Sequence, residues 1–204
     1  MPRLGKLADV LVSYILGKVF YDPHSYWERR AAVYKTYRPK FHEQHKTAAM
    51  KLLVGSVLEV GCGTGRLLSI HKGLGVDFSL NMLKQCEGER IAMDAAFLGF
   101  IDKSFDTVFT CETLMHIKPD QIERVVSQIL RIARKRIVAI EYDGNLPILA
   151  KHLFKHDYRK FFPGAKICDL LPSAKAYKLG RESVFVYDLE GTDSIAANMA
   201  VQRG

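Results

Sequence analysis

An acidic residue followed by three alternating glycines is the feature of this sequence best suited to chemistry. Glu59, Gly61, Gly63 and Gly65 lie in the segment SVLEVGCGTGRLL, residues 56–68. Glycines at every second position let the backbone turn sharply from a strand into a helix and approach a ligand closely. The acid disfavours a pyrophosphate at this turn and favours a ligand that carries a positive group.

The spacing of the glycines separates this motif from two common nucleotide-binding turns. A dinucleotide fingerprint needs its third glycine at position 66, where the chain has Arg66. A phosphate-binding P-loop needs Gly-Lys-Ser/Thr, which this segment lacks. The four cysteines form no CxxC pair and no His/Cys cluster, so neither a metal site nor a disulfide framework is expected.

Strands that could position this turn alternate with helices from residue 56 onward. Five strands are predicted at 56–61, 74–78, 89–94, 104–111 and 136–142. Helices are predicted at 65–71, 79–86 and 119–134, the last beginning at Pro119 and Asp120. This alternation predicts an α/β, Rossmann-like, mostly parallel sheet with helices on both faces.

The region after the fifth strand is expected to complete this sheet. A helical insertion is predicted over 146–162, followed by two strands at 166–171 and 182–189. The two late strands are expected to form an antiparallel C-terminal hairpin, which makes seven strands in all.

The whole chain is expected to form one globular unit with three parts. Residues 1–55 are predicted to be an N-terminal helical lid, 56–190 the main domain and 191–204 a polar tail. Helices are expected in the lid over roughly 5–20 and 25–53, with Ser25 as a cap and a break at Pro39. Aromatic and arginine side chains alternate in the second segment, where they could bind a substrate ring or an anion or simply pack the lid.

Several motifs in order resemble the class I S-adenosylmethionine-dependent methyltransferases, more narrowly the small single-domain, type 11-like kind. VLEVGCGTG is similar to the family's glycine motif, and GVDFSLNML to its second-strand motif GVDxSxxML. AMDAAFLGFIDKSFDTVFTCETLMHI resembles its xGDAxxLPFxDxSFDxVxxxxxLxHI. The resemblance covers about residues 55–142 and implies an enzyme whose cofactor is S-adenosylmethionine. LGF stands where the family has LPF, and the usual PGG turn is missing, which leaves the substrate class open.

The resemblance implies a cofactor site at the ends of the first two strands. The turn made by Gly61, Cys62, Gly63 and Gly65 would hold the methionine part, and Glu59 would face its ammonium group. Asp77 would accept the ribose hydroxyls, although it could instead cap the end of its strand.

Residues after the second, third and fourth strands would complete the site. Asp94 and the Ala95 amide would bind the adenine edge, with Phe78 or Met82 against its face, although Asp94 could be a helix cap. The resemblance also implies contacts with the cofactor at the end of the fourth strand, from Cys111, Glu112 and Leu114. Core packing is the alternative role for Cys111 and Leu114.

A general base is needed only if the acceptor atom arrives protonated, because a sulfonium is already a strong methyl donor. His116 and His156 are the candidate catalytic residues, since histidine can take a proton near neutral pH. His116 could equally be a packed group and His156 a surface residue. Further candidates at the same end of the sheet are Glu141, Asp143, Asp157 and Tyr158.

The charge distribution suggests several acceptors. The formal net charge is +8, and both flanks are basic around a slightly acidic middle, which suits an anionic substrate, RNA or only a solvated basic surface. We expect transfer to an O or N atom of a small molecule, because little chain lies outside the main domain. RNA or protein methylation and non-catalytic cofactor binding are the alternatives. The apolar segment 7–20 is too short to span a bilayer, so no membrane partner is expected. The scattered cysteines suggest a reducing compartment, so a cytoplasmic protein is expected.

Overall fold

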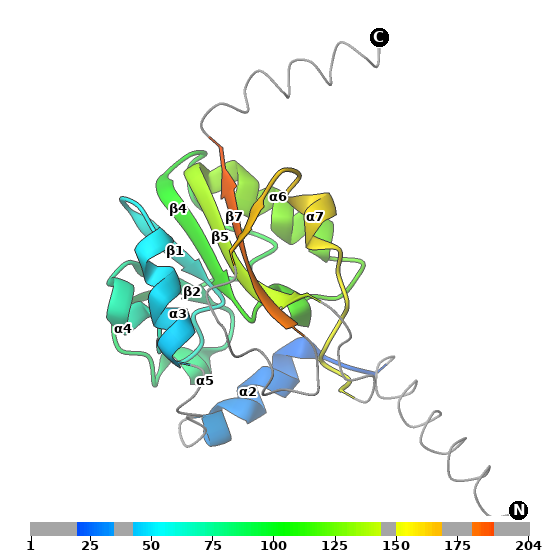
Figure 1. Ribbon diagram of the computed structural model, residues 1–204. Helices are drawn as coiled ribbons and strands as arrows, with labels where there is room; N and C mark the ends of the chain where they lie inside the picture. Colours follow the sequence, from blue (N-terminus) through cyan, green and yellow to red (C-terminus); the bar gives the residue numbers. More distant parts are fainter. Residues whose placement is uncertain (1–19, 35–42, 144–149, 169–180, 190–204) are drawn as a thin grey trace, which may run out of the picture.

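Seven strands form a single sheet in the computed structural model, which describes residues 20–34, 43–143, 150–168 and 181–189 (Figure 1). Their order is β3-β2-β1-β4-β5-β7-β6. The first five strands are parallel, whereas β7 is antiparallel to both β5 and β6. The bounds are β1 Val57–Val60, β2 Leu74–Asp77, β3 Glu89–Ala92, β4 Phe105–Cys111, β5 Ala133–Asp143, β6 Lys166–Cys168 and β7 Arg181–Asp188. The expected Rossmann-like sheet with an antiparallel C-terminal hairpin is confirmed.

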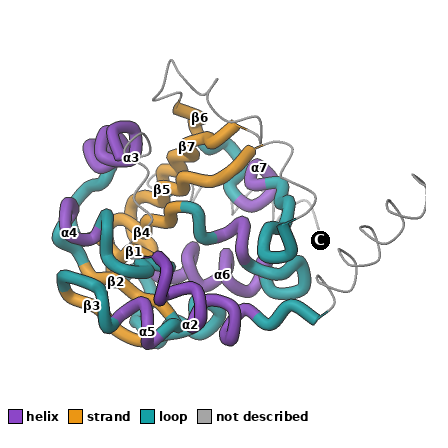
Figure 2. The backbone as a smooth tube through the Cα atoms, turned by 90° about the horizontal axis from the view of Figure 1, so that it is seen from below, coloured by secondary structure: helices purple, strands orange, loops and turns teal. Residues whose placement is uncertain are grey.

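Helices lie on both faces of this sheet. Figure 2 shows α3 on one side and α6 on the other. The described helices are α2 Pro23–Tyr34, α3 Glu43–Ala49, α4 Leu68–His71, α5 Leu80–Leu83, α6 Ile122–Ile132 and α7 Tyr158–Phe161, with short 3-10 helices η1 Met50–Leu52 and η2 Leu114–His116.

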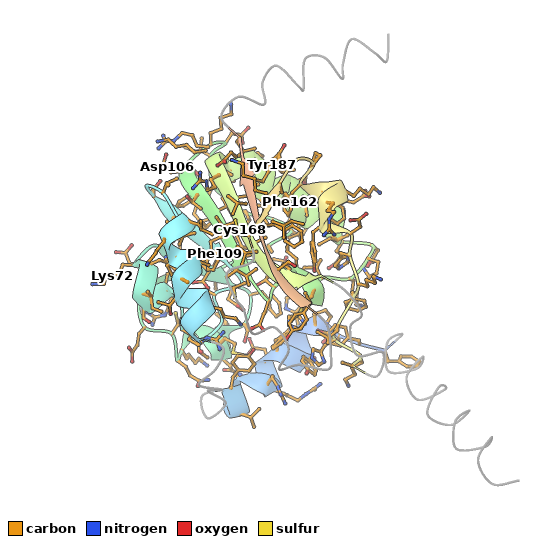
Figure 3. The ribbon with its side chains drawn as sticks, viewed as in Figure 1. Lys72, Asp106, Phe109, Phe162, Cys168 and Tyr187 are labelled. Carbon is orange, nitrogen blue, oxygen red and sulfur yellow. The ribbon has the colours of Figure 1, made fainter. Side chains whose placement is uncertain are left out.

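The central strands are buried on both faces because helices cover both. On the α3 side, Phe109 of β4 packs with Val138 and Ile140 of β5. On the other side, α6 and α7 pack on the sheet, and the Phe162 ring lies 6.1 Å from that of Tyr187 (Figure 3). Each fully buried large apolar side chain contributes roughly 1.5–3 kcal/mol, so these two layers fix the strand ends that carry the site.

The best-defined helix begins later than the sequence predicts. Pro119 and Asp120 lie in a turn, and α6 starts at Ile122. The Lys118 carbonyl accepts hydrogen bonds from the N–H groups of Gln121 and Ile122, which closes this turn before the helix begins. The predicted apolar stripe is confirmed, because its members are buried or pack against the core: Ile122, Val125, Val126, Ile129, Leu130 and Ile132.

Only the end of the predicted insertion helix is helical. Residues 150–157 are not helical and α7 begins at Tyr158, whereas 144–149 lie outside the described residues. The N–H of Phe154 donates to the Met115 carbonyl at 2.8 Å, so this backbone bonds to η2 instead of to its own next turn. Asp157 then caps α7 by accepting from the Arg159 N–H.

Helix α2 also differs from its predicted start. It begins at Pro23, and the Asp22 carboxylate accepts from the N–H of Ser25 at 2.9 Å, so Ser25 is inside the helix and does not cap it. Proline suits a first helical turn because its missing N–H would have no partner there. The predicted helix over 5–20, the break at Pro39 and the tail 191–204 lie outside the described residues.

Side-chain hydrogen bonds hold α2 across the carboxyl ends of the parallel strands (Figure 1). Glu28 of α2 accepts from the N–H of Asn81 at 3.2 Å, and Gln85 donates to the Ala31 carbonyl at 3.0 Å. Both partners lie in or beside α5, so α2 is attached to the element that follows β2. Among the described residues, no helix has the length and apolar character that crossing a membrane requires.

Part of the predicted basic surface lies away from α2. Asp106 is at the far end of the sheet from α2 (Figure 3), and it pairs with Arg134 at 2.8 Å and Lys135 at 3.3 Å. Arg136 pairs with Asp188 at 2.6 Å. These three basic residues therefore pair with acids and do not line the site described below.

Candidate functional site

A cavity of about 640 Å³ opens at the carboxyl ends of the parallel strands, bordered by α2. This volume is in the range of pockets that bind small molecules and cofactors. Most of the residues predicted for a cofactor site line it. They are Glu59, Gly61, Cys62, Gly63, Gly65, Asp77, Phe78, Met82, Asp94, Ala95, Cys111 and Glu112, with His116 also in the lining.

The three glycines of the turn have different surroundings. All have positive φ, at 77°, 54° and 76° for Gly61, Gly63 and Gly65. A Cβ at Gly61 would collide with the Thr113 side chain, and one at Gly65 with the Cys86 thiol. A Cβ at Gly63 would meet nothing within 4 Å. The outer glycines therefore allow the turn to pack, and Gly63 leaves open space in the cavity.

The carboxylate of Glu59 is buried, and the side chain that donates a hydrogen bond to it is a neutral histidine. Its Oε2 lies 3.0 Å from His71 Nε2. Because His71 Nδ1 accepts from the Gly73 N–H at 3.0 Å, the ring proton is on Nε2, and a neutral imidazole donates to Glu59. Burial raises the pKa of Glu59, and the hydrogen bond from His71 opposes that rise. The arrangement suits a ligand with a positive group near Glu59.

Asp77 connects the ends of β1 and β2. Its Oδ2 accepts from the Gly63 N–H at 2.9 Å and its Oδ1 from the Ser79 N–H at 2.8 Å. Burial raises the pKa of Asp77, and these two backbone hydrogen bonds oppose the rise. Asp77 therefore has a structural role as well as a place in the cavity lining.

The predicted adenine-binding residues lie together at the β3 side of the cavity. Asp94 Oδ1 accepts from the Ala96 N–H at 2.8 Å, which orders the turn after β3 and leaves its other oxygen for a further partner. Phe78 packs at 4.5 Å from the His24 ring of α2. Met82 is 3% exposed and also lines the cavity.

His116 lies between α2 and the loop that contains His152. Its Nδ1 is 2.8 Å from the His152 carbonyl oxygen, which can only accept, so Nδ1 carries the proton and Nε2 keeps its lone pair. The Trp27 ring packs edge-on at 4.7 Å. Burial lowers the pKa of His116 to about 4, so the ring is neutral at pH 7. A neutral ring with a free Nε2 is able to accept a proton.

Two predicted site residues are outside the cavity lining formed by the described residues. Leu114 is fully buried in the core between the sheet and α6, which is the alternative that its apolar type allowed. His156 donates from Nε2 to the Ile117 carbonyl at 2.9 Å, and burial lowers its pKa. Its ring therefore attaches the 150–157 segment to the loop after η2, outside the cavity lining.

Other candidate bases also have structural partners. Glu141 is fully buried, and its two oxygens accept from Thr110 Oγ1 and from the N–H groups of Thr113, Leu114 and Met115. Burial raises the pKa of Glu141 to about 7 although these four donors oppose the rise. Tyr158 is in the core and Asp157 caps α7. Glu141 thus holds the η2 turn that presents His116.

Four residues that border or support the cavity were not among the predicted site residues. Arg66 and Thr113 line it directly, His71 supports Glu59, and Lys46 lies 2.6 Å from Glu112. Arg66 could have been found, because it directly follows the glycine turn. The contacts of His71 and Lys46 depend on packing between segments, and neither has a local sequence signal.

Residues 58–140 match the model of a protein family described as a methyltransferase domain. This segment contains the glycine turn, β2, β3, β4 and η2, whose ends border the cavity together with α2.

Solved structures with this fold include methyltransferases bound to S-adenosylmethionine. The chain is similar to magnesium protoporphyrin IX methyltransferase from Synechocystis with bound S-adenosylmethionine, with TM-score 0.58, 17% identity and coverage of 86% of this chain and 96% of that one. The chain has the fold of the class I S-adenosylmethionine-dependent methyltransferases, and residues 58–140 match a methyltransferase domain. The resemblance found in the sequence motifs is confirmed at the level of the fold and of this domain, and the Synechocystis enzyme was crystallised with S-adenosylmethionine.

Other proteins similar to this chain differ in what their descriptions say of an acceptor. A structure from Thermotoga maritima described as a possible histamine N-methyltransferase has TM-score 0.60 and 20% identity, covering 79% of this chain and 97% of that one. An uncharacterized protein of Methanocaldococcus jannaschii is 29% identical over 110 residues, 51% of this chain. The matched part is 44% of that relative's length. At these identities the solved structures establish the fold alone.

Proposed function

We propose that this methyltransferase transfers the methyl group of S-adenosylmethionine to an oxygen or nitrogen atom of a small molecule held in the same cavity. The observation that carries this proposal is the continuity of the cavity lining, which extends from the glycine turn to Trp27 and His116 under α2. A single space could therefore hold both the methyl donor and the acceptor.

The residues of the cavity fit the cofactor. Gly63 offers the open space in which a ligand can approach the backbone, and Glu59 offers a carboxylate for the ammonium group. Asp77 would accept the ribose hydroxyls, as the acid at the end of the second strand does in dinucleotide folds.

Adenine would lie at the β3 side of the cavity. Asp94 and the Ala95 amide would hold its edge, and Phe78 and Met82 would pack against its face. When bound, the cofactor supplies an electrophilic methyl group on a sulfonium.

The chain's main contribution is to position the acceptor and exclude water. Holding two reactants in line can lower a barrier by roughly 7–11 kcal/mol. In the proposed arrangement, residues 1–55 act as the lid. Its α2 helix contributes Trp27 and Tyr34 to the cavity lining, and these rings would exclude water from the acceptor.

His116 would accept a proton from an acceptor that arrives protonated. The His152 carbonyl fixes the proton on Nδ1 and leaves Nε2 as the basic atom. Glu112 would stabilise the imidazolium that forms, since its charge acts to raise the pKa of His116 against the effect of burial.

Cover by α2 favours a small acceptor over a macromolecule, and we assign the reaction to the cytoplasm. The four cysteines are all free thiols, which suits a reducing compartment. A tethered nucleic acid or protein segment would have to displace Trp27 and His24 from the cavity rim.

The test is to incubate the full chain with labelled S-adenosylmethionine and a fractionated cell extract. We expect label in a small-molecule fraction, and a Gly63→Val control should give none because a branched side chain fills the cofactor space. Label in RNA or protein would overturn the choice of a small acceptor. No transfer by a chain that binds S-adenosylhomocysteine would overturn the transfer itself.

A further inference from the structure

One end of the cavity contains a cluster of three charged side chains, of which the two basic ones have no role in the proposed function. Lys46 of α3, Glu112 after β4 and Arg66 after the glycine turn lie close together. We propose that Arg66 binds the carboxylate of the cofactor's methionine, and that Lys46 positions Arg66 for this by neutralising Glu112. This inference rests on the proposed function, and it assigns a contact with the cofactor that the sequence motifs did not.

Lys46 and Glu112 form the tight pair of the cluster. Lys46 Nζ is 2.6 Å from Glu112 Oε2, and the lysine side chain is 1% exposed. A buried lysine needs a close carboxylate because removal of its charge from water is costly. Glu112 also has φ 51°, a conformation that residues other than glycine rarely adopt. The backbone is thus held in a strained form that directs this carboxylate toward α3.

Arg66 is left with unused hydrogen-bond donors. Its guanidinium is 3.8 Å from Glu112 Oε2, which exceeds a hydrogen-bond distance. Within the described part of the chain, the Arg66 side chain donates no other hydrogen bond, although it lines the cavity with a side chain 28% exposed. With Glu112 committed to Lys46, the cluster has a net charge of one positive unit directed at the cavity through Arg66.

The opposite charge lies on the other side of the same turn. Glu59 is a carboxylate whose His71 partner is neutral, so it contributes one negative unit. Arg66 follows the glycine turn and Glu59 precedes it, and the positive charge of Arg66 acts to lower the pKa of Glu59. A positive and a negative group separated by a glycine turn match the carboxylate and ammonium of an amino acid.

Arginine suits this task because its planar guanidinium can hold a carboxylate through two parallel hydrogen bonds. Without Lys46, Glu112 would be free to draw the guanidinium away and to repel a ligand carboxylate. Lys46 is therefore a positioning residue that acts through Glu112.

The experiment compares two ligands by calorimetry on the full chain. S-adenosylhomocysteine carries the amino-acid group, and 5′-methylthioadenosine lacks it. Arg66→Met should lower S-adenosylhomocysteine affinity about ten- to a hundredfold, the effect of losing charged hydrogen bonds, and should leave 5′-methylthioadenosine affinity within about twofold. Lys51→Met removes an exposed cation outside the cavity lining and should change neither affinity.

A double variant tests the role of Lys46. Lys46→Met should lower S-adenosylhomocysteine affinity, and adding Glu112→Gln should restore most of it, because the carboxylate that competes for Arg66 is gone. A Lys46 that only stabilises the fold would not be rescued by this second change. Unchanged 5′-methylthioadenosine binding shows in each case that the cavity is folded.

Three results would overturn the inference while leaving the proposed function intact. They are equal loss of both ligands in Arg66→Met, an equal loss of S-adenosylhomocysteine affinity in Lys51→Met, and no rescue of Lys46→Met by Glu112→Gln. If the folded wild-type chain binds neither ligand, the proposed function fails and the inference fails with it.

Discussion

Substitution of Gly63 by alanine separates the fold from the ligand site. The new methyl group would meet no protein atom within 4 Å, so its cost to the free chain comes from the backbone alone. Gly63 has φ 54°, and a residue with a Cβ loses about 1–2 kcal/mol in this left-handed conformation. The melting temperature should therefore fall by about 2–8 °C for a chain of this size.

Cofactor binding should fall by more than this strain explains. If the ligand contacts the Gly63 backbone, the added methyl group overpacks the contact, at a cost of about 1–3 kcal/mol. That cost corresponds to a loss of affinity of about five- to 150-fold. The assay is titration calorimetry with S-adenosylhomocysteine, paired with thermal unfolding of the free protein.

Gly164 provides a matched control. It also has positive φ, at 80°, and a Cβ there would likewise meet nothing within 4 Å, but it lies between α7 and β6, outside the cavity lining. Gly164→Ala should lower the melting temperature by a similar amount and leave affinity unchanged. Equal affinity in the two variants would refute the assignment of Gly63 to ligand contact.

Three further substitutions test single side chains. Asp77→Ala should lower cofactor affinity about ten- to a hundredfold. It should also lower the free energy of unfolding by about 1–3 kcal/mol, because the Gly63 and Ser79 N–H groups lose their acceptor. Unchanged cofactor affinity would contradict the ribose role of Asp77. His116 has a pKa of about 4 in the folded chain against about 6.5 unfolded, so the unfolded state binds more protons between these values. His116→Asn should therefore gain stability relative to wild type as pH falls from 6.5 to 4 in urea unfolding, and a difference independent of pH would contradict the buried neutral ring. For Glu141 the pH dependence of stability has the opposite sign, because its pKa of about 7 in the folded chain exceeds the unfolded value. The Glu141→Gln variant should therefore gain stability relative to wild type as pH rises from 4.5 to 7. An opposite trend would contradict a raised pKa for Glu141.

The parallel part of the fold could be predicted because its signals are local. The apolar runs that became β1 and β4, and the glycines between β1 and α4, specify strand, turn and helix within a few residues. The parallel direction of these strands follows once strands and helices alternate, since a helix between two strands lets the chain cross back and run the same way. The same locality explains why most of the residues predicted for the site line the cavity, since they lie directly after strand ends.

The predictions that were wrong depend on contacts between distant segments. Pro119 is a good first residue of a helix, yet the turn on Lys118 delays α6 to Ile122. The 150–157 segment has a helical pattern, but its backbone bonds to Met115 in η2. Propensity is a weak guide where tertiary hydrogen bonds compete with the helix.

The supporting partners in the site were missed for the same reason. Glu112 and Lys46 are 66 residues apart, and nothing near either residue in the sequence indicates the other. The neutral state of His71 follows only from the Gly73 N–H that bonds its Nδ1. Charge states of this kind require the positions of backbone donors, which a residue pattern does not contain.

The most direct test of the central claim is a calorimetric titration of the full chain with S-adenosylhomocysteine and, separately, with NAD. Arg66 stands where a dinucleotide fingerprint has glycine, and Glu59 disfavours a pyrophosphate. We therefore expect one equivalent of S-adenosylhomocysteine to bind and NAD to bind far more weakly. Tighter binding of NAD, or no binding of S-adenosylhomocysteine by the folded chain, would contradict the assignment of the cavity.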